Sequence, residues 1–204
     1  MSGEGARQQS WADCWSAIRA DVYRATGEPA VLAVPRRIWR SPVGRYLVAM
    51  RLCAWARSST SRLPILAIVR PFYRHWSAVY GLEIPYVCHI GPGLKVLHHS
   101  GGVVVNSQVT IGRRCTIGPG VTVGRKRTGE RAGSPVIGDD VTISTGAKLI
   151  GGIVIGDRVT IGANSVATKS IPPDTVVAGI PAAPLPGATP EPPTFGDIDR
   201  FDRG

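Results

Sequence analysis

Residues 137–167 read IGDDVTISTGAKLIGGIVIGDRVTIGANSVA and place an aliphatic side chain at every sixth position. The same period extends upstream of this stretch. The in-phase positions are Val105, Ile111, Ile117, Val123, Ile137, Ile143, Leu149, Ile155 and Ile161. A helix repeats every 3.6 residues and a half-buried strand every two, so neither produces a sustained period of six. A parallel β-helix does, because each hexapeptide forms one short strand and one corner.

Three hexapeptides close one triangular coil, so that equivalent side chains stack at the roughly 4.8 Å spacing of neighbouring strands. The aliphatic side chain points into the prism. Gly or Asn supplies the positive φ that a corner needs, as at Gly146 and Asn164. The segment from Ile84 to Ala183 has room for about five to six coils. The sequence therefore predicts a mainly β chain built on a parallel β-helix.

The remaining sequence divides the chain into three parts. Its 204 residues, 21.6 kDa, leave no room for a second catalytic module such as a nucleotide-sugar pyrophosphorylase. We expect three or four short helices in residues 1–80, the β-helix with an inserted loop at 125–136 in residues 81–183, and a Pro-rich, disordered or extended tail in residues 184–204. Prolines punctuate the helical part at Pro35, Pro42, Pro64 and Pro71.

The helical part is strongly basic, with twelve arginines against four acidic residues, and the whole chain carries a formal charge of +10. This balance favours an anionic partner. Two alternatives stay open: a solvated surface whose arginine stems cover apolar side chains, or docking to an anionic membrane or substrate. Charges interrupt the apolar segments, so no window reaches the roughly 20 residues of a spanning helix. Nucleic-acid binding is not expected, because the prism lacks a basic stripe and stacking aromatics.

The four cysteines are scattered and form no Cys-x-x-Cys pair; they are Cys14, Cys53, Cys88 and Cys115. The first ten residues, MSGEGARQQS, lack the apolar core of a signal peptide. We therefore expect reduced thiols and a cytoplasmic protein.

Two breaks in the period mark candidate functional segments. After Val96 the next in-phase residue is expected near position 102, but the later frame starts at Val105, so about three extra residues bulge around His98 and His99. A bulge lifts side chains out of a stacked wall, which is how a repeat fold presents a catalytic group. A histidine pair in isolation is also compatible with a plain surface turn.

The second break separates Val123 from Ile137 by 14 residues where six are expected. The eight-residue insertion is polar and glycine-rich, and it is either a simple surface loop or an anion-binding segment. Its basic residues are Arg125, Lys126, Arg127 and Arg131.

The chain resembles the hexapeptide-repeat acyltransferases, and within them the serine O-acetyltransferase-like branch. The resemblance rests on EIPYVCHIGPGLKVLHHSGGVVVNSQVTIG at 83–112 and on the segment from GDDVTI to AGIPA at 138–182. It implies a left-handed parallel β-helix, a homotrimer with sites between neighbouring prisms, and acetyl-CoA as co-substrate without a metal. The complex-forming serine acetyltransferases end in Ile, whereas residue 204 is Gly, so no cysteine synthase partner is expected.

The resemblance also assigns roles to individual residues. It implies that His99 is the catalytic base, that His98 precedes it, and that Glu83 orients the base where serine-specific members usually have Asp. Imidazole suits the task because its pKa lies near neutrality. It places Arg131 beside the acceptor. The histidine that follows this arginine in serine-specific members is Ala132 here, which puts serine specificity in doubt.

Coenzyme A contacts are implied along the groove between two prisms, where small residues allow close approach. The matching positions are Gly124, Thr145, Gly146, Ala163, Asn164 and Lys169. Ordinary corner chemistry is the alternative for the small residues, and solvation is the alternative for the lysine.

The leading functional hypothesis is an O-acetyltransferase that moves acetyl from acetyl-CoA to the hydroxyl of a small polar acceptor, with histidine as general base. One alternative is serine O-acetyltransferase proper, and another is a non-catalytic β-helix binding scaffold. The zinc carbonic anhydrase that shares this prism needs three histidines around the metal. His89, His98 and His99 do not have that spacing.

Overall fold

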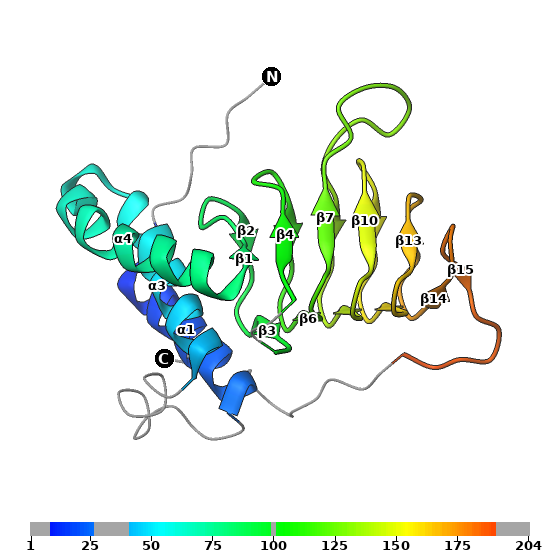
Figure 1. Cartoon of the computed structure of the whole chain (residues 1–204), viewed down its shortest axis with the longest axis horizontal. Coiled ribbons are helices and arrows are strands. Elements are labelled where there is room, and N and C mark those ends of the chain that lie inside the picture. Colours follow the sequence, from blue (N-terminus) through cyan, green and yellow to red (C-terminus); the bar gives the residue numbers. More distant parts are fainter. Residues whose placement is uncertain (1–8, 27–40, 99–100, 191–204) are drawn as a thin grey trace.

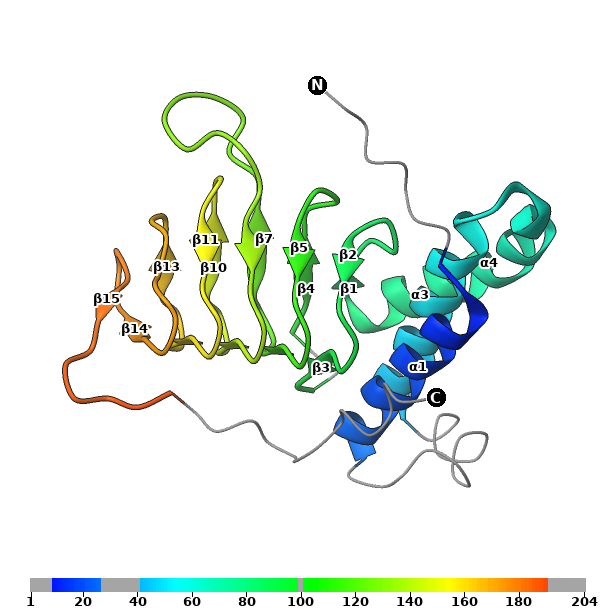
Figure 2. The ribbon, with the colours of Figure 1, turned by 180° about the vertical axis from the view of Figure 1, so that it is seen from behind.

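The computed structural model describes residues 9–26, 41–98 and 101–190. Three α-helices cover one end of a prism of short strands (Figure 1). They are α1 (Trp11–Thr26), α3 (Pro42–Arg57) and α4 (Leu63–Tyr80), with the 3₁₀ turn η1 (Thr60–Arg62) before α4. Helix α3 packs between the other two, α4 contacts the first strand and α1 contacts β3 (Figure 2). No described helix is both long and apolar enough to cross a membrane.

Local sequence explains the ends of these helices. The Ser41 hydroxyl accepts a hydrogen bond from the Gly44 N–H at the start of α3, and Pro42 occupies the first turn. Helix α4 ends at Gly81, whose φ of 64° makes it a left-handed cap. Pro71 was expected to separate two helices, and this prediction was wrong because α4 continues through it. Packing of α4 on α3 and on the prism outweighs the local cost of the proline.

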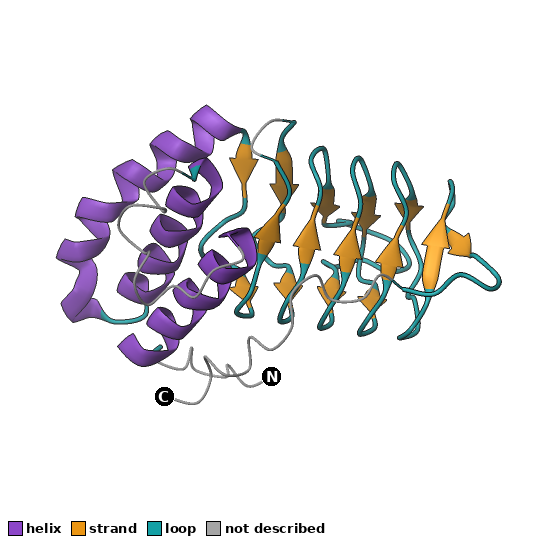
Figure 3. Cartoon of the chain, turned by 90° about the horizontal axis from the view of Figure 1, so that it is seen from below, coloured by secondary structure: helices purple, strands orange, loops and turns teal. Residues whose placement is uncertain are grey.

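The prism has five coils, and each contributes a strand or bridge to each of three sheets (Figure 3). Sheet A contains β1 (Leu82–Glu83), β4 (Val103–Val105), β7 (Thr122–Gly124), β10 (Lys148–Ile150) and β13 (Val166–Ala167). Sheet B contains β2 (His89–Ile90), β5 (Thr110–Ile111), β8 (Val136–Ile137) and β11 (Val154–Ile155). Sheet C contains β3 (Lys95–Val96), β6 (Thr116–Ile117), β9 (Thr142–Ile143), β12 (Thr160–Ile161), β14 (Val176–Ala178) and β15 (Ala183–Pro184). Among the strand pairs of the described residues, β14–β15 alone is antiparallel, because the chain reverses within AGIPA at 178–182.

Strand register confirms the period and both insertions. Ile137 pairs with Ile155, 18 residues later, which is the length of an uninterrupted coil. Val96 pairs with Ile117 at a separation of 21, which is three more than 18. Ile111 pairs with Ile137 at a separation of 26, which is eight more. The insertion itself lies between β7 and β8, so it ends at 135 rather than 136.

The in-phase aliphatic side chains fill the prism, and Ile111, Ile117, Ile143 and Leu149 are completely buried. Positive φ occurs at Gly146 and Asn164, as predicted for the corner between sheets C and A. The corner between sheets B and C differs, because Gly93 has a positive φ only in the first coil and charged residues adopt it in the four later coils. These are Arg114, Asp140, Arg158 and Asp174. They form two ion pairs, Arg114 with Asp140 and Arg158 with Asp174, each with N···O distances of 2.6 Å.

Buried charges join the helices to the open end of the prism. Asp21 on α1 and Arg51 on α3 are 1% and 5% exposed and form an ion pair at 2.8 Å. The Asp21 carboxylate also accepts hydrogen bonds from the N–H groups of Gly93 and Leu94 at 2.8 Å. It therefore satisfies backbone donors of the first coil that have no coil before them.

Two arginines satisfy backbone acceptors in the first two coils. Arg51 donates to the carbonyl of Gly91 at 2.7 Å and also to that of Ile90. Arg24, 2% exposed, donates to the carbonyls of Gly93 and Cys115 at 2.7 and 3.1 Å. Neither arginine fits the two surface roles considered for the basic helical region, because both are internal.

Candidate active site

The first break in the repeat lies at the corner between sheets C and A, where the chain passes from β3 to β4. His98 is exposed there and has a φ of 59°. His99, the base implied by resemblance, lies outside the described residues. After it, Gly101 has a φ of 115°, and a Cβ on this residue would lie 2.8 Å from the Cβ of Pro119. Gly101 therefore lies directly against Pro119 of the next coil, and only glycine fits at this position.

Glu83 is exposed on β1, beside the same corner. Leu82 and Glu83 pair in parallel with Val103 and Val104, which follow the histidine-bearing connection. The Val103 N–H donates to the Gly81 carbonyl at 2.9 Å. The structure therefore brings the Glu83 strand next to this connection, while the side chain of His99 lies outside the described part of the chain.

Two tyrosines of the helical region fix the strand that carries Glu83. The Tyr46 hydroxyl of α3 donates to the Ile84 carbonyl at 2.9 Å and accepts from the Ile84 N–H at 3.0 Å. The Tyr73 hydroxyl of α4 donates to the same carbonyl at 3.0 Å. Burial raises the pKa of both phenols, so they remain neutral donors. Sequence reasoning missed them, because a tyrosine at helical spacing gives no sign of a partner beyond its own helix.

The histidine corner continues through the later coils as a column of small, solvent-accessible residues. The Gly146 N–H donates to the Pro119 carbonyl, and the Asn164 N–H donates to the Thr145 carbonyl, both at 2.8 Å. Thr145, Ala163 and Asn164 are exposed. Four of the six residues matched to coenzyme A contacts therefore lie along one edge of the prism, and this edge begins at His98.

Lys148 was not anticipated, although it is the only charged residue between Asp140 and Asp157. It lies on the outward side of β10, where its ammonium donates to the Thr122 hydroxyl at 3.1 Å and to the Gly120 carbonyl. These two bonds link Lys148 to β7 and to the corner between sheets C and A in the preceding coil.

The other residues matched by resemblance lie at the opposite corner, between sheets A and B. The inserted loop closes through reciprocal backbone hydrogen bonds at 2.9 Å between Lys126 and Gly133. Arg131 has a φ of 59°, and its guanidinium donates to the Thr168 carbonyl at 3.4 Å and to Glu130 at 3.2 Å. The loop is therefore folded along the fourth and fifth coils, next to Lys169.

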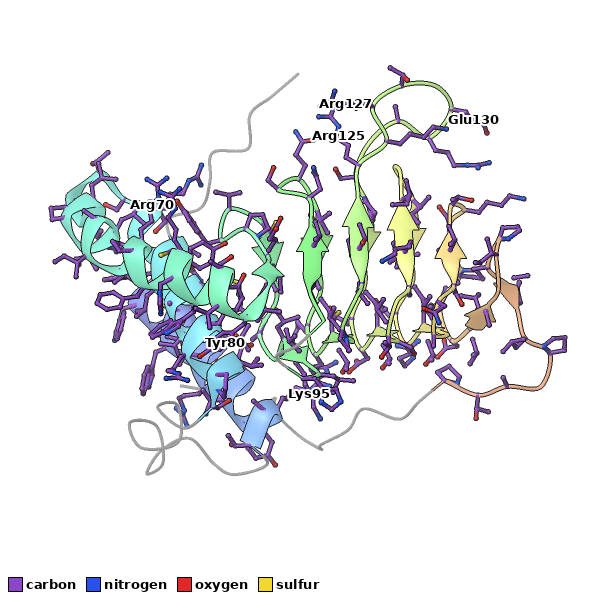
Figure 4. All side chains as sticks on the ribbon, viewed as in Figure 1. Arg70, Tyr80, Lys95, Arg125, Arg127 and Glu130 are labelled. Carbon is purple, nitrogen blue, oxygen red and sulfur yellow. The ribbon has the colours of Figure 1, made fainter. Side chains whose placement is uncertain are left out.

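Arg125 and Arg127 are exposed, and both follow β7 closely at the start of this loop (Figure 4). Gly124 begins the loop at the end of β7. Strands of sheet A separate this group from His98, because they run from the histidine corner to the loop corner. A single chain thus presents the matched residues as two groups, on two edges of the prism.

The thiols are poor candidates for nucleophiles. All four cysteines are free, and burial raises their pKa to about 11 for Cys14, Cys53 and Cys88 and to about 12 for Cys115. Each is therefore protonated near neutral pH. Within the described residues, no three His, Cys, Asp or Glu side chains gather as metal ligands would.

Comparison with known proteins shows what this chain is similar to. Residues 134–169 match the bacterial transferase hexapeptide (six repeats) family. The serine acetyltransferase of Synechococcus elongatus is 36% identical over 138 residues, which cover 66% of this chain and 53% of that protein. The chain spans about half the length of the curated relatives it matches.

Solved structures show the same likeness over more of the chain. Soybean serine acetyltransferase complexed with serine is 28% identical with a TM-score of 0.67, covering 85% of this chain and 70% of that one. A serine acetyltransferase complex with CoA is 25% identical with a TM-score of 0.64, covering 85% and 68%. The predicted fold class, a left-handed parallel β-helix after N-terminal helices, is confirmed. The chain thus carries the hexapeptide repeat, and the relatives and solved structures that it resembles are serine acetyltransferases.

Proposed function

We propose that the chain is an acetyl-CoA-dependent O-acetyltransferase acting on the hydroxyl of a small polar acceptor. The observation that carries this proposal is the three-residue break in the coil register at the His98–His99 corner, beside the strand that bears Glu83. A scaffold without catalysis has no need of this break, because an unbroken hexapeptide closes the same corner in the later coils.

His99 acts as the general base in this proposal. Its imidazole accepts the proton of the acceptor hydroxyl while the hydroxyl oxygen forms a bond to the thioester carbonyl carbon. The carbon–sulfur bond then breaks, and the imidazolium returns the proton to the departing sulfur. Glu83 accepts a hydrogen bond from the other ring nitrogen and stabilises the required tautomer. The raised thiol pKa values support direct attack rather than an acetyl-cysteine intermediate.

The small-residue column supports binding of the coenzyme A arm along the same edge. A Cβ on Gly146 would lie 2.0 Å from the Asn164 side-chain oxygen, so this position stays open only as glycine. The exposed cations of the inserted loop, with Lys169, supply the charge that phosphates require. The unpaired cysteines support a reducing compartment, and we propose the cytoplasm.

We also propose a homotrimer, because the two groups of matched residues occupy different edges of one prism. A neighbouring protomer that packs its loop edge against the histidine edge would complete the site. Light scattering at micromolar concentration is expected to give three times the chain mass of 21.6 kDa. A purely monomeric mass would contradict the shared site.

Serine is expected to be a weak acceptor, although the relatives named above are serine acetyltransferases. Ala132 lacks the imidazole that serine-specific members have after the arginine, and a lost charged hydrogen bond costs about 1.5–3 kcal/mol, or roughly 10–150-fold. Release of thiol from acetyl-CoA, compared across serine, homoserine and a panel of sugars, measures this preference. A kcat/KM for L-serine above about 10⁴ M⁻¹s⁻¹ would identify serine as the true acceptor.

A further inference from the structure

The strand that bears Glu83 lies at the open end of sheet A. Strand β1 pairs with β4 on one side and has no described strand on the other, so its outer edge takes its partners from outside the sheet. The side chains of Leu82 and Ile84 are 1% and 0% exposed, whereas Glu83 between them is exposed. Backbone groups of such buried residues cost free energy when they stay unpaired.

Three hydroxyls of the helical region, which we call the edge hydroxyls, bond to this edge. The Ser77 hydroxyl of α4 donates to the Leu82 carbonyl at 2.6 Å. The Tyr46 hydroxyl accepts from the Ile84 N–H at 3.0 Å and donates to the Ile84 carbonyl at 2.9 Å. The Tyr73 hydroxyl donates to the same carbonyl at 3.0 Å. The two tyrosine rings stack with their centroids 5.5 Å apart, so both hydroxyls reach one residue.

These bonds hold both peptide planes that flank Glu83. The Leu82 carbonyl belongs to the plane before the Cα of Glu83, and the Ile84 N–H belongs to the plane after it. A peptide plane is rigid, so fixing the two planes fixes the backbone dihedrals of Glu83 and the direction of its Cα–Cβ bond. Tyr46 is completely buried and Tyr73 is 9% exposed, so water competes little for their hydrogen bonds. The Glu83 side chain therefore starts from a defined position beside the histidine connection.

We propose that the edge hydroxyls position the Glu83 carboxylate and so couple the helical region to acetyl transfer. This inference rests on the proposed function, in which Glu83 orients the His99 imidazole. Catalytic groups have to be held within about 0.5 Å of the productive geometry, and a misplacement of about 1 Å can cost about 10²-fold in rate. The same hydroxyls also stabilise the fold, so the test has to separate loss of alignment from loss of stability.

The first variants remove hydroxyls and keep the rings. Tyr46→Phe is expected to lower kcat about 10-fold, and Tyr46→Phe with Tyr73→Phe about 10²-fold. The KM for acetyl-CoA should stay within about 2-fold, because the column of small residues matched to its contacts lies in later coils. The matched control is Tyr80→Phe, because the Tyr80 hydroxyl accepts from the Arg45 guanidinium at 2.8 Å (Figure 4). It should leave kcat unchanged.

A double-mutant cycle with Glu83→Ala separates alignment from stability. The tyrosine hydroxyls act through the carboxylate in this proposal, so their removal should cost no more than about 2-fold once Glu83→Ala has removed it. General loosening of the prism would instead lower kcat by the same factor in both backgrounds. Hydrogen exchange gives a readout that needs no turnover. The Ile84 amide should exchange at least about 10-fold faster in Tyr46→Phe, and at the unmodified rate in Tyr80→Phe.

Circular dichroism verifies that each variant is folded at the assay temperature. If the double tyrosine variant does not fold, Ser77→Ala in the same cycle decides, because it acts on the other peptide plane and should lower kcat about 5-fold. Unchanged kcat, equal losses with and without Glu83→Ala, or unchanged Ile84 exchange in Tyr46→Phe would overturn the positioning role and leave the transferase function standing. An unmodified chain that acetylates no acceptor would overturn both proposals.

Discussion

Replacement of His99 by alanine is expected to lower the rate of acetyl transfer by about 10²–10⁴-fold, because the acceptor hydroxyl then loses its general base. Thiol release from acetyl-CoA at saturating acceptor measures the effect. The residue lies in a connection inserted into the coil, so its side chain is not one of the stacked aliphatic positions. Coenzyme A binding and the midpoint of thermal unfolding should therefore change little.

The matched control is His98→Ala, which removes the other imidazole of the pair. His98 is exposed and has a positive φ, so its loss should leave most of the transfer rate. If the His98 variant is inactive and the His99 variant keeps its full rate, the assignment along the connection is wrong by one residue.

Asp21→Asn is expected to lower the free energy of unfolding by about 3–5 kcal/mol, because it leaves Arg51 buried without its carboxylate. The same substitution weakens the acceptor for the N–H groups of Gly93 and Leu94 at the open end of the prism. Urea unfolding followed by circular dichroism, at a fixed protein concentration, measures the loss.

Asp174→Asn is the control, because it breaks an ion pair with Arg158 that is more than half exposed on both sides. Solvent screens such pairs, so the unfolding midpoint should stay close to that of the unmodified chain. Equal unfolding midpoints for the Asp21 variant and the unmodified chain would show that the buried pair does not hold the helices on the prism.

The sequence is sufficient to predict the prism, because a period of six has one structural solution. The phase of the six-residue repeat also located both insertions. Val96 pairs with Ile117 and Ile111 pairs with Ile137, so these two turns of the prism are three and eight residues longer than the regular 18. Each inward position needs only an aliphatic side chain, and this requirement is visible in every hexapeptide.

Contacts between distant segments could not be predicted in the same way. Arg24 and Arg51 look like the other arginines of the helical region, yet they bond to backbone carbonyls 39 to 91 residues away. Tyr46 and Ile84 are 38 residues apart. Such pairs depend on how the helices meet the first coil, and no local pattern records that packing.

The candidate site, too, was only partly predictable from the sequence. The phase of the repeat located the histidine connection and the resemblance supplied the roles of His99 and Arg131, but which edge of the prism each group occupies came only from the structure. The direction of the sheet A strands separates them, and this is a property of the coil rather than of any motif. The same reasoning explains why Lys148 was missed, since its partners lie in the preceding coil.

The most direct test of the proposed direct attack uses acetyl-CoA labelled in the acetyl group. The label is expected to appear as an ester on the acceptor, in step with thiol release, and to stay absent from the protein when acceptor is withheld. The His99→Ala variant should slow ester formation by the same factor of about 10²–10⁴, without trapping label on the protein. Covalent labelling of the protein in the absence of acceptor, or thiol release without any acetylated acceptor across the panel, would contradict direct transfer.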